Sequence, residues 1–223
     1  MPIIAVIQQK GGAGKSTIAG NLIAELIERK HSVLAFDLDP QRTLSRWAGE
    51  GEGLLRRRVT AMDVDESRHR LLRAAVEEAL RAAEYVVLDT PPGFGPAAMS
   101  AALLTDIALV PVGPSPADLL ASGDARELLR EARRQRGSEK PVIAFVPSMT
   151  MRNTWSRELP SMLERFGERV FPGIVRRTAY LDAFAKGLTL REHLKGKGKG
   201  VTELDLLALA VERTLGGPHV DCA

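Results

Sequence analysis

Lys10-Gly11-Gly12-Ala13-Gly14-Lys15-Ser16-Thr17 is the stretch that decides the fold of this sequence. It follows a short apolar segment, Ile3–Gln8, and it opens a segment, Ser16–Arg29, whose apolar residues recur at helical spacing. We therefore predict a strand, a loop and a helix in that order. Glycines let backbone N–H groups approach phosphate oxygens, and the helix N-terminus adds partial positive charge. Such a loop binds phosphate, with Lys15 reaching the β and γ phosphates and the Ser16 hydroxyl ligating Mg²⁺.

Further strands and helices alternate along the chain. We predict strands over 32–36, 85–88, 107–110 and 142–146, and helices over 67–83, 97–104, 117–135, 153–166 and 202–215. Gly137 is expected to cap one of these helices and Thr202 to begin another, whereas residues 41–66 are expected to be irregular. The alternation predicts an α/β fold with a mostly parallel sheet and helices on both of its faces. Motifs at the strand ends should then meet at one edge of the sheet.

The glycine loop departs from the strict phosphate-loop pattern, because Gln9 occupies the position of its first glycine and an extra lysine, Lys10, follows. This deviant Walker A pattern resembles the ParA/MinD family of P-loop ATPases, and above all small plasmid-type ParA proteins without an N-terminal helix-turn-helix. The resemblance implies an ATPase that dimerises on ATP, with Lys10 reaching the partner's nucleotide and Lys15 acting within its own subunit. It assigns nucleotide binding to Lys10, Gly11, Gly12, Ala13, Gly14, Lys15, Ser16 and Thr17.

Carboxylates stand at two other strand ends. Asp37 and Asp39, in Asp37-Leu38-Asp39-Pro40-Gln41, point to one face of an extended chain and can both approach a phosphate site. Asp89 ends a third strand. By the same resemblance Asp39 positions the attacking water, Asp37 lies near the metal, and Asp89 is the Walker B aspartate that holds Mg²⁺ through water. Taken singly, each aspartate could also be a helix cap or a turn former.

A proline-rich stretch, Pro111–Asp118, follows the fourth strand. It resembles a segment that lies near the nucleotide and the dimer interface in plasmid-type ParA proteins, so we expect Pro114 near the nucleotide. A rigid turn between strand and helix is an equally good interpretation. The preference for adenine over guanine as the nucleotide base rests on the resemblance alone, although a guanine-specific N-K-x-D pattern is absent from the sequence.

Composition limits the class of protein. The 223 residues carry a net charge of +3, with 44% hydrophobic and 4% aromatic residues, which fits one soluble domain with an aliphatic core. We expect that domain over 1–215 and a flexible tail over 216–223. A single cysteine, Cys222, leaves no internal disulfide and no cysteine-ligated cluster. The chain shows no export signal and no apolar run long enough for a membrane span, so a cytoplasmic protein is expected.

Positive charge is concentrated in one segment. Residues 176–199 hold seven lysines and arginines against Asp182 and Glu192. Grouped cations bind a phosphate backbone without reading its sequence, and they can equally be a solvated surface. We predict nonspecific DNA contact, and with it association with the nucleoid, by Arg176, Arg177, Lys186, Lys195, Lys197 and Lys199.

The favoured function is an ATP-switched partition or positioning protein whose hydrolysis is slow until a ParB-like or other adaptor protein stimulates it. Its cargo could be a plasmid, a chromosome or a protein assembly. A MinD-like membrane-associated ATPase is an alternative, but residues 201–215 lack the basic amphipathic pattern that membrane binding requires. An ATP-dependent metabolic ligase is the other alternative, and the sequence leaves it open. An iron–sulfur electron-transfer ATPase would need more cysteines.

Overall fold

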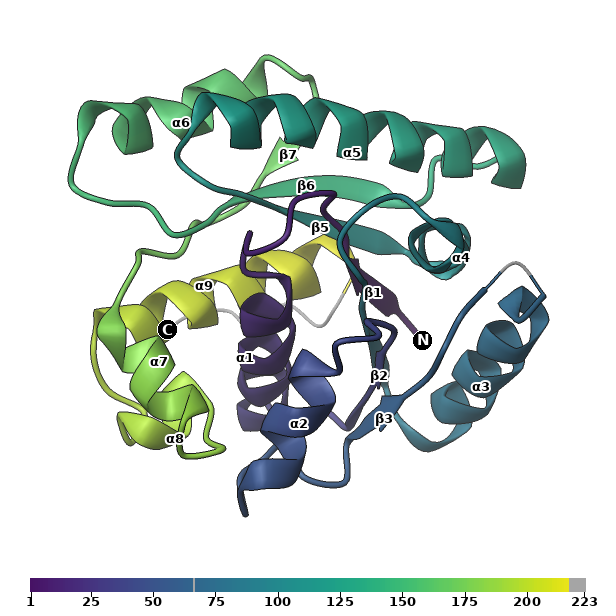
Figure 1. The fold of residues 1–223 in the computed structure, drawn as a ribbon, viewed down its shortest axis with the longest axis horizontal. Helices are drawn as coiled ribbons and strands as arrows, with labels where there is room; N and C mark the ends of the chain where they lie inside the picture. The colour runs from purple at the N-terminus through teal and green to yellow at the C-terminus, as the bar shows by residue number, and fades with distance from the viewer. Residues whose placement is uncertain (66, 217–223) are drawn as a thin grey trace.

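The computed structural model describes residues 1–65 and 67–216, which are built around one sheet (Figure 1). Its seven strands run in the order β3-β2-β4-β1-β5-β6-β7, and every neighbouring pair is parallel. The strands are β1 (Ile3–Val6), β2 (Val33–Asp37), β3 (Val59–Ala61), β4 (Tyr85–Asp89), β5 (Ile107–Val112), β6 (Val142–Pro147) and β7 (Arg169–Val170). The predicted fold class, a mostly parallel sheet between helices, is confirmed. The two edge strands, β3 and β7, were not among the strands predicted from the sequence.

Nine helices occur among the described residues. They are α1 (Lys15–Glu28), α2 (Thr43–Glu50), α3 (His69–Ala82), α4 (Pro96–Leu104), α5 (Pro116–Arg136), α6 (Thr154–Glu164), α7 (Thr178–Phe184), α8 (Leu190–His193) and α9 (Lys199–Thr214). The prediction that residues 41–66 are irregular was wrong, because this segment holds α2 and β3. Gly137 caps α5 in the left-handed conformation, as predicted. Thr202 does not begin α9, which starts one turn earlier after Gly198, where φ is 98°.

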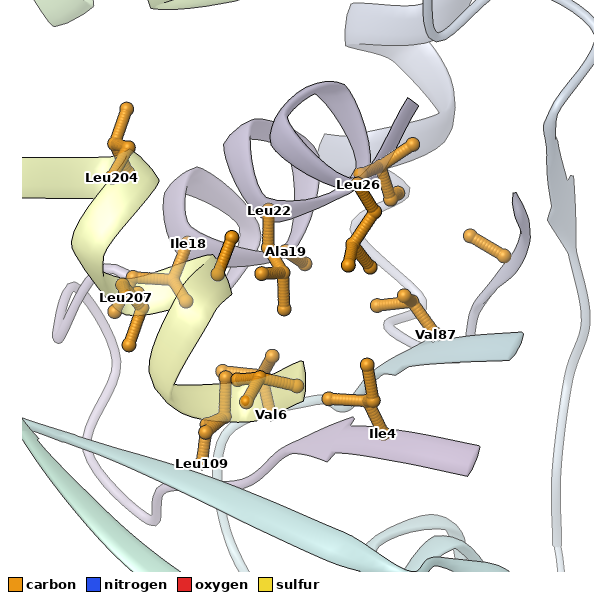
Figure 2. Close-up of a cluster of buried hydrophobic side chains, with 14 of the residues drawn as sticks. Ile4, Val6, Ile18, Ala19, Leu22, Leu26, Val87, Leu109, Leu204 and Leu207 are labelled. Carbon is orange, nitrogen blue, oxygen red and sulfur yellow. The ribbon is translucent and has the colours of Figure 1, made fainter. Parts of the chain in front are cut away.

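The strands bury alternate residues in two separate cores. On one face Ile4 and Val6 pack against α1, α2, α8 and α9, whereas on the other Ile3, Ala5 and Ile7 pack beneath α3, α4, α5 and α6. Figure 2 shows the first core, where residues of α1 and α9 meet residues of β1, β4 and β5. Burying each such leucine or isoleucine contributes roughly 1.5–3 kcal/mol. Aliphatic side chains on both faces therefore hold β1 rigidly in the middle of the sheet.

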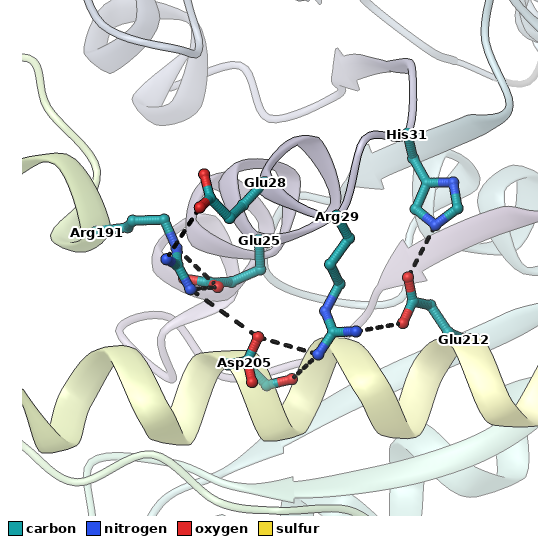
Figure 3. Close-up of polar contacts among 7 residues, drawn as sticks. All are labelled: Glu25, Glu28, Arg29, His31, Arg191, Asp205 and Glu212. Carbon is teal, nitrogen blue, oxygen red and sulfur yellow. Dashed lines mark hydrogen bonds and ion pairs between the residues drawn. The ribbon is translucent and has the colours of Figure 1, made fainter. Parts of the chain in front are cut away.

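A polar network fastens α8 and α9 to α1 (Figure 3). The Arg191 guanidinium on α8 donates to Glu25, which is fully buried on α1, with Nη2 and Oε2 2.5 Å apart. Arg29, at the end of α1, bonds Asp205 and Glu212 of α9 at 3.0 Å each. These ion pairs fix the C-terminal helices relative to the helix that follows the glycine loop. The network consists of Glu25, Glu28, Arg29, His31, Arg191, Asp205 and Glu212.

Two predictions about the ends of the chain have different outcomes. The single domain over 1–215 stays a prediction, which the shared sheet supports. The predicted tail lies outside the described residues from 217 onward. No helix in the described part of the chain combines the length and the apolar character needed to cross a bilayer.

Candidate nucleotide site

The glycine loop leaves the carboxyl end of β1, the central strand, and leads into α1. Gly12 and Gly14 have φ angles of 74° and 93°, a conformation that side chains with a Cβ rarely adopt. A Cβ on Gly14 would also lie 2.9 Å from the Ser148 hydroxyl oxygen. Both glycines are therefore required by the backbone, and left-handed residues of this kind are typical of an anion-binding nest.

Hydrogen bonds hold the loop to the strands on both sides of β1. The Gln8 amide donates to the Pro111 carbonyl at 2.8 Å, and the Gln9 N–H donates to the Gln8 side chain. On the other side the Thr90 hydroxyl donates to the Val6 carbonyl at 2.8 Å, and the Gly93 N–H donates to the Gln9 carbonyl. These bonds tie the loop to β5 on one side and to the residues after β4 on the other.

Lys15 is buried at the first turn of α1, with 7% of the residue exposed. Its ammonium donates to the Lys10 carbonyl at 3.3 Å. Burial lowers the pKa of Lys15, and the nearby carboxylates Asp89 and Asp39 oppose this effect. A desolvated cation beneath a glycine loop binds phosphate oxygens strongly, because little water competes for it.

Asp89 is fully buried at the end of β4, and neither of its carboxylate oxygens has a hydrogen-bond partner among the described residues. Burial raises its pKa to about 7, with Asp37 and Asp39 adding to the rise. Ser16 and Lys15 lie near enough to lower this pKa, although the Ser16 hydroxyl is not in hydrogen-bonding geometry. An unpaired buried carboxylate beside a serine hydroxyl fits Mg²⁺, which favours oxygen ligands and keeps several waters.

Asp37 is the register partner of Asp89 in the neighbouring strand, but its oxygens are occupied. One accepts from the Asp39 N–H at 3.1 Å, and the other accepts from both the N–H and the hydroxyl of Ser45 at 2.8 Å. Ser45 lies in the first turn of α2, so Asp37 supplies the cap that α2 lacks locally. The Asp39 carboxylate accepts from the Gln41 N–H at 2.8 Å. The metal role of Asp37 and the water-positioning role of Asp39 stay predictions.

Lys10 lies at the surface of the site and pairs with Asp118 in the first turn of α5. Its ammonium is 2.7 Å from one Asp118 oxygen, with 43% of the lysine side chain and 12% of the aspartate side chain exposed. The other Asp118 oxygen accepts from the Ser115 hydroxyl and lies against Gly113, where a Cβ would be 2.7 Å away. Asp118 is therefore held in place and in turn holds Lys10 within its own subunit.

A cleft of about 450 Å³ opens beside the glycine loop, and sequence reasoning missed most of its lining. It is bounded by Gly14 and Thr17 from the loop and α1, and otherwise by Ser148, Met149 and the segment 174–178, 180 and 181. The hydroxyls of Ser148 and Tyr180 are buried there without a partner among the described residues. Pro114, predicted to lie near the nucleotide, is not among the lining residues. For Ser148, the sequence offered one signal of a place in the site: the residue directly follows β6, at the same edge of the sheet as the glycine loop.

The six predicted DNA-contacting cations lie in different surroundings. Arg177 makes two bonds of 2.6 Å to Glu203 on α9, which raise its pKa, and Arg176 borders the cleft. The others are exposed: Lys186, Lys195, Lys197 and Lys199. Arg191, which also belongs to the positive segment, forms an ion pair with Glu25. The segment therefore presents fewer available cations than its composition indicates.

A glycine loop between a central parallel strand and a helix, with a buried lysine and an unpaired carboxylate beneath it, defines a P-loop nucleotide-binding protein. The family model CobQ/CobB/MinD/ParA nucleotide binding domain matches residues 4–190, so the chain belongs to this family, as the sequence predicted. It is a nucleotide-binding ATPase of the ParA/MinD type.

Individual relatives agree with this assignment. The chain is 32% identical to maintenance of carboxysome distribution protein A of Halothiobacillus neapolitanus over 203 residues, which cover 90% of this chain and 91% of that protein. Its fold is similar to that of a Cyanothece McdA variant in complex with ATP (19% identity, TM-score 0.73, 100% and 99% of the two chains). MinD of Pyrococcus horikoshii with Mg-ADP is also similar (21%, 0.77, 96% and 97%). These two solved structures contain ATP and Mg-ADP, and the cofactors of the present chain, ATP and Mg²⁺, stay predictions.

Proposed function

We propose that this protein is an ATP-switched partition or positioning ATPase. ATP closes a homodimer, the dimer binds DNA of the nucleoid without sequence preference in the cytoplasm, and a ParB-like or other adaptor protein stimulates hydrolysis and release. The cargo is a plasmid, a chromosome or a protein assembly. The observation that carries the proposal is Lys10, a second lysine at the phosphate loop, whose side chain is 43% exposed and is held only by an ion pair with Asp118 among the described residues.

Different residues of the site bind the phosphates, hold Mg²⁺ and orient the attacking water. Lys15 and the loop N–H groups bind the phosphates within one subunit, while Lys10, once free of Asp118, reaches the nucleotide of the other subunit. Ser16 and Asp89 hold Mg²⁺, which neutralises phosphate charge when bound. Asp39 accepts a hydrogen bond from the attacking water and so orients it. The hydroxyls of Ser148 and Tyr180, which have no partner among the described residues, lie beside Gly14 and Thr17 and support placing the base and sugar in the cleft.

The DNA-binding part of the proposal rests on the exposed lysines of 186–199. A membrane-binding function finds less support, because α9 buries Leu204, Leu207 and Val211 against α1 and the sheet. This helix would have to leave the core before it could offer those side chains to lipid. The proposal therefore assigns the positive surface to DNA and not to a membrane.

Titration of DNA with the protein in ATP, in ADP and without nucleotide tests the switch. We expect salt-sensitive, sequence-independent binding with ATP alone. Lys15→Ala should abolish nucleotide binding and with it DNA binding. Asp39→Ala should retain ATP and remain a dimer that binds DNA, because only the water loses its acceptor.

Two outcomes contradict the proposal. Equal DNA binding in all three nucleotide states would remove the switch. An Asp39→Ala variant that binds ATP yet stays monomeric would remove the trapped dimer, and with it the role of this carboxylate in hydrolysis.

A further inference from the structure

We propose that the turn between α2 and β3, residues 51–58, joins the lysines of 186–199 in one cationic surface that binds the phosphate backbone of duplex DNA. This inference rests on the proposed DNA binding and extends it to a segment outside the C-terminal part of the chain. We call the turn the arginine turn, because it ends in Arg56-Arg57-Arg58.

The arginine turn lies directly against the connection between α7 and α8. A Cβ on Gly51 or on Gly53 would lie 2.7 or 2.8 Å from the Gly187 carbonyl oxygen, so the two backbones touch. The Leu54 N–H donates to a Glu192 carboxylate oxygen on α8 at 2.7 Å. Residues more than 130 positions apart in sequence therefore form one continuous surface.

The cations of the arginine turn are poorly neutralised. Arg56 pairs with the exposed Glu52, but Arg57 is exposed and makes no ion pair with any residue that the structure describes. Its φ is 63°, and the Arg58 N–H donates to the Leu55 carbonyl at 3.1 Å, so Arg57 lies within a tight turn. Arg58 follows with no salt bridge inside the described ranges. The turn thus adds uncompensated positive charge beside α8.

The carboxylate of Glu192, between the two groups of cations, is occupied by hydrogen bonds within the protein. Glu192 accepts from the Leu54 N–H through one oxygen and from the Thr189 N–H and hydroxyl through the other. Lys186, Lys195 and Lys197, on either side of it in the sequence, are exposed, and none pairs with a carboxylate in the part of the chain described here. A polyanion approaching this face therefore meets cations from both segments.

Helix α2 keeps the two halves of this surface together. The Trp47 indole N–H donates to the Leu188 carbonyl at 3.0 Å, and its ring lies 5.4 Å from that of Phe184 on α7. The first turn of α2 is held by Asp37 through Ser45, at the strand end beside the phosphate loop. The arginine turn and the lysine segment are thus fixed to one another and to the nucleotide site.

Two segments that present cations along one face suit a rigid duplex, whose regularly spaced phosphates release counterions on binding. We would measure binding of the ATP-bound protein to a short mixed-sequence DNA duplex over a range of KCl concentrations. The test variant is Arg56→Ala/Arg57→Ala. Its matched control, Arg70→Ala/Arg73→Ala, removes two exposed arginines from α3, which packs on the opposite face of the sheet.

We expect the test variant to bind DNA roughly tenfold more weakly and with a salt dependence shallower by about 1–2 in log–log slope, while the control binds like wild type. ATP binding and dimerisation should be unchanged in both variants. A third variant, Lys195→Ala/Lys197→Ala, reports on the lysine half of the surface.

The outcomes separate this inference from the proposed function. If the lysine variant loses affinity while the arginine variant matches its control, the arginine turn is not part of the surface, although DNA binding itself stands. If the wild-type protein fails to bind DNA with ATP, the proposed function fails and the inference falls with it. If the arginine variant loses binding to anionic phospholipid vesicles but not to DNA, the surface serves a membrane and the inference is overturned.

Discussion

At the scale of single residues, Asp89 is the group whose surroundings most clearly require a ligand. Its carboxylate is fully buried, has no hydrogen-bond partner in the described ranges, and has a pKa of about 7. Burial opposes ionisation, so an empty site favours the protonated acid, whereas a cation favours the carboxylate. Binding of Mg²⁺ should therefore release a proton from this residue near neutral pH.

The pH dependence of stability tests this environment. The pKa of Asp89 is raised in the folded protein, so its contribution to stability is complete below about pH 4, the unfolded value, and is lost as the pH rises toward 7. Asp89→Asn cannot ionise. Without nucleotide or Mg²⁺, its melting temperature should therefore rise relative to wild type between these pH values, by about 2–4 °C per kcal/mol. A difference in melting temperature that is constant with pH would contradict the raised pKa.

The ion pair between Lys10 and Asp118 predicts a threshold for dimerisation. In the proposed dimer, Lys10 must leave Asp118 before it can reach the other subunit, and a partly exposed pair of this kind contributes about 0.2–1 kcal/mol. The Asp118→Asn variant should therefore dimerise at a lower ATP concentration than wild type, by up to about fivefold per subunit. Sedimentation velocity at increasing ATP measures this, with Lys10→Ala as a control that stays monomeric. An unchanged or higher ATP requirement would show that Asp118 does not restrain Lys10.

Local residues were the predictable part of the site. The glycine loop could be recognised because its chemistry is complete within eight consecutive positions. Tyr180 could not, because the fold alone brings it beside Gly14, and for Ser148 the one available signal was its position directly after β6. Arg177 looked like a free cation, but it is paired with Glu203, which lies 26 residues further along the chain.

At the scale of helices and strands, α2 shows why some elements escape prediction. Its own residues provide no side-chain cap, and the donor in its first turn is satisfied by Asp37, eight residues earlier. Trp47 then buries α2 against α1. The strands of the central sheet were predictable from apolar runs, whereas the two-residue β7 and the partly exposed β3 carry too little pattern. Elements whose support comes from other parts of the chain leave no local signal.

The contact between α1 and α2 gives a prediction about Gly20. Alanine at a helix interior is favoured over glycine by about 1 kcal/mol, but a Cβ here would lie 2.3 Å from the Trp47 ring. Overpacking costs about 1–3 kcal/mol, and the ring is held by its bond to Leu188, so the clash should dominate. Gly20→Ala should lower the free energy of unfolding in urea, and adding Trp47→Leu should recover part of the loss. A stabilised single variant would mean that the ring moves freely.

At the scale of the whole molecule, the polar network between α1, α8 and α9 joins the beginning of the chain to its C-terminal helices. Burial raises the pKa of Glu25, and Arg191 opposes that rise. The attraction between Glu25 and Arg191 adds little net stability by itself. Removing Arg191 is nevertheless strongly destabilising, because it leaves a buried carboxylate without a partner.

Arg191→Met should lower the free energy of unfolding by about 3–5 kcal/mol at about pH 8. The loss should shrink toward about pH 5, because the pKa of Glu25 rises further without the guanidinium and the residue can take up a proton. Urea unfolding at both pH values measures this, and Glu25→Gln/Arg191→Met should remove the pH dependence of the difference. An equal loss at both pH values would place the cost in packing and not in charge.

The placement of α9 also bears on how the protein is made. Its leucines complete the core that covers α1, and its acidic residues hold the end of that helix. While the ribosome is still translating residues 199–214, the helix behind the phosphate loop has an open apolar flank. A nascent chain should therefore acquire ATP only after α9 has emerged from the exit tunnel, so half-made subunits should stay out of the proposed dimers.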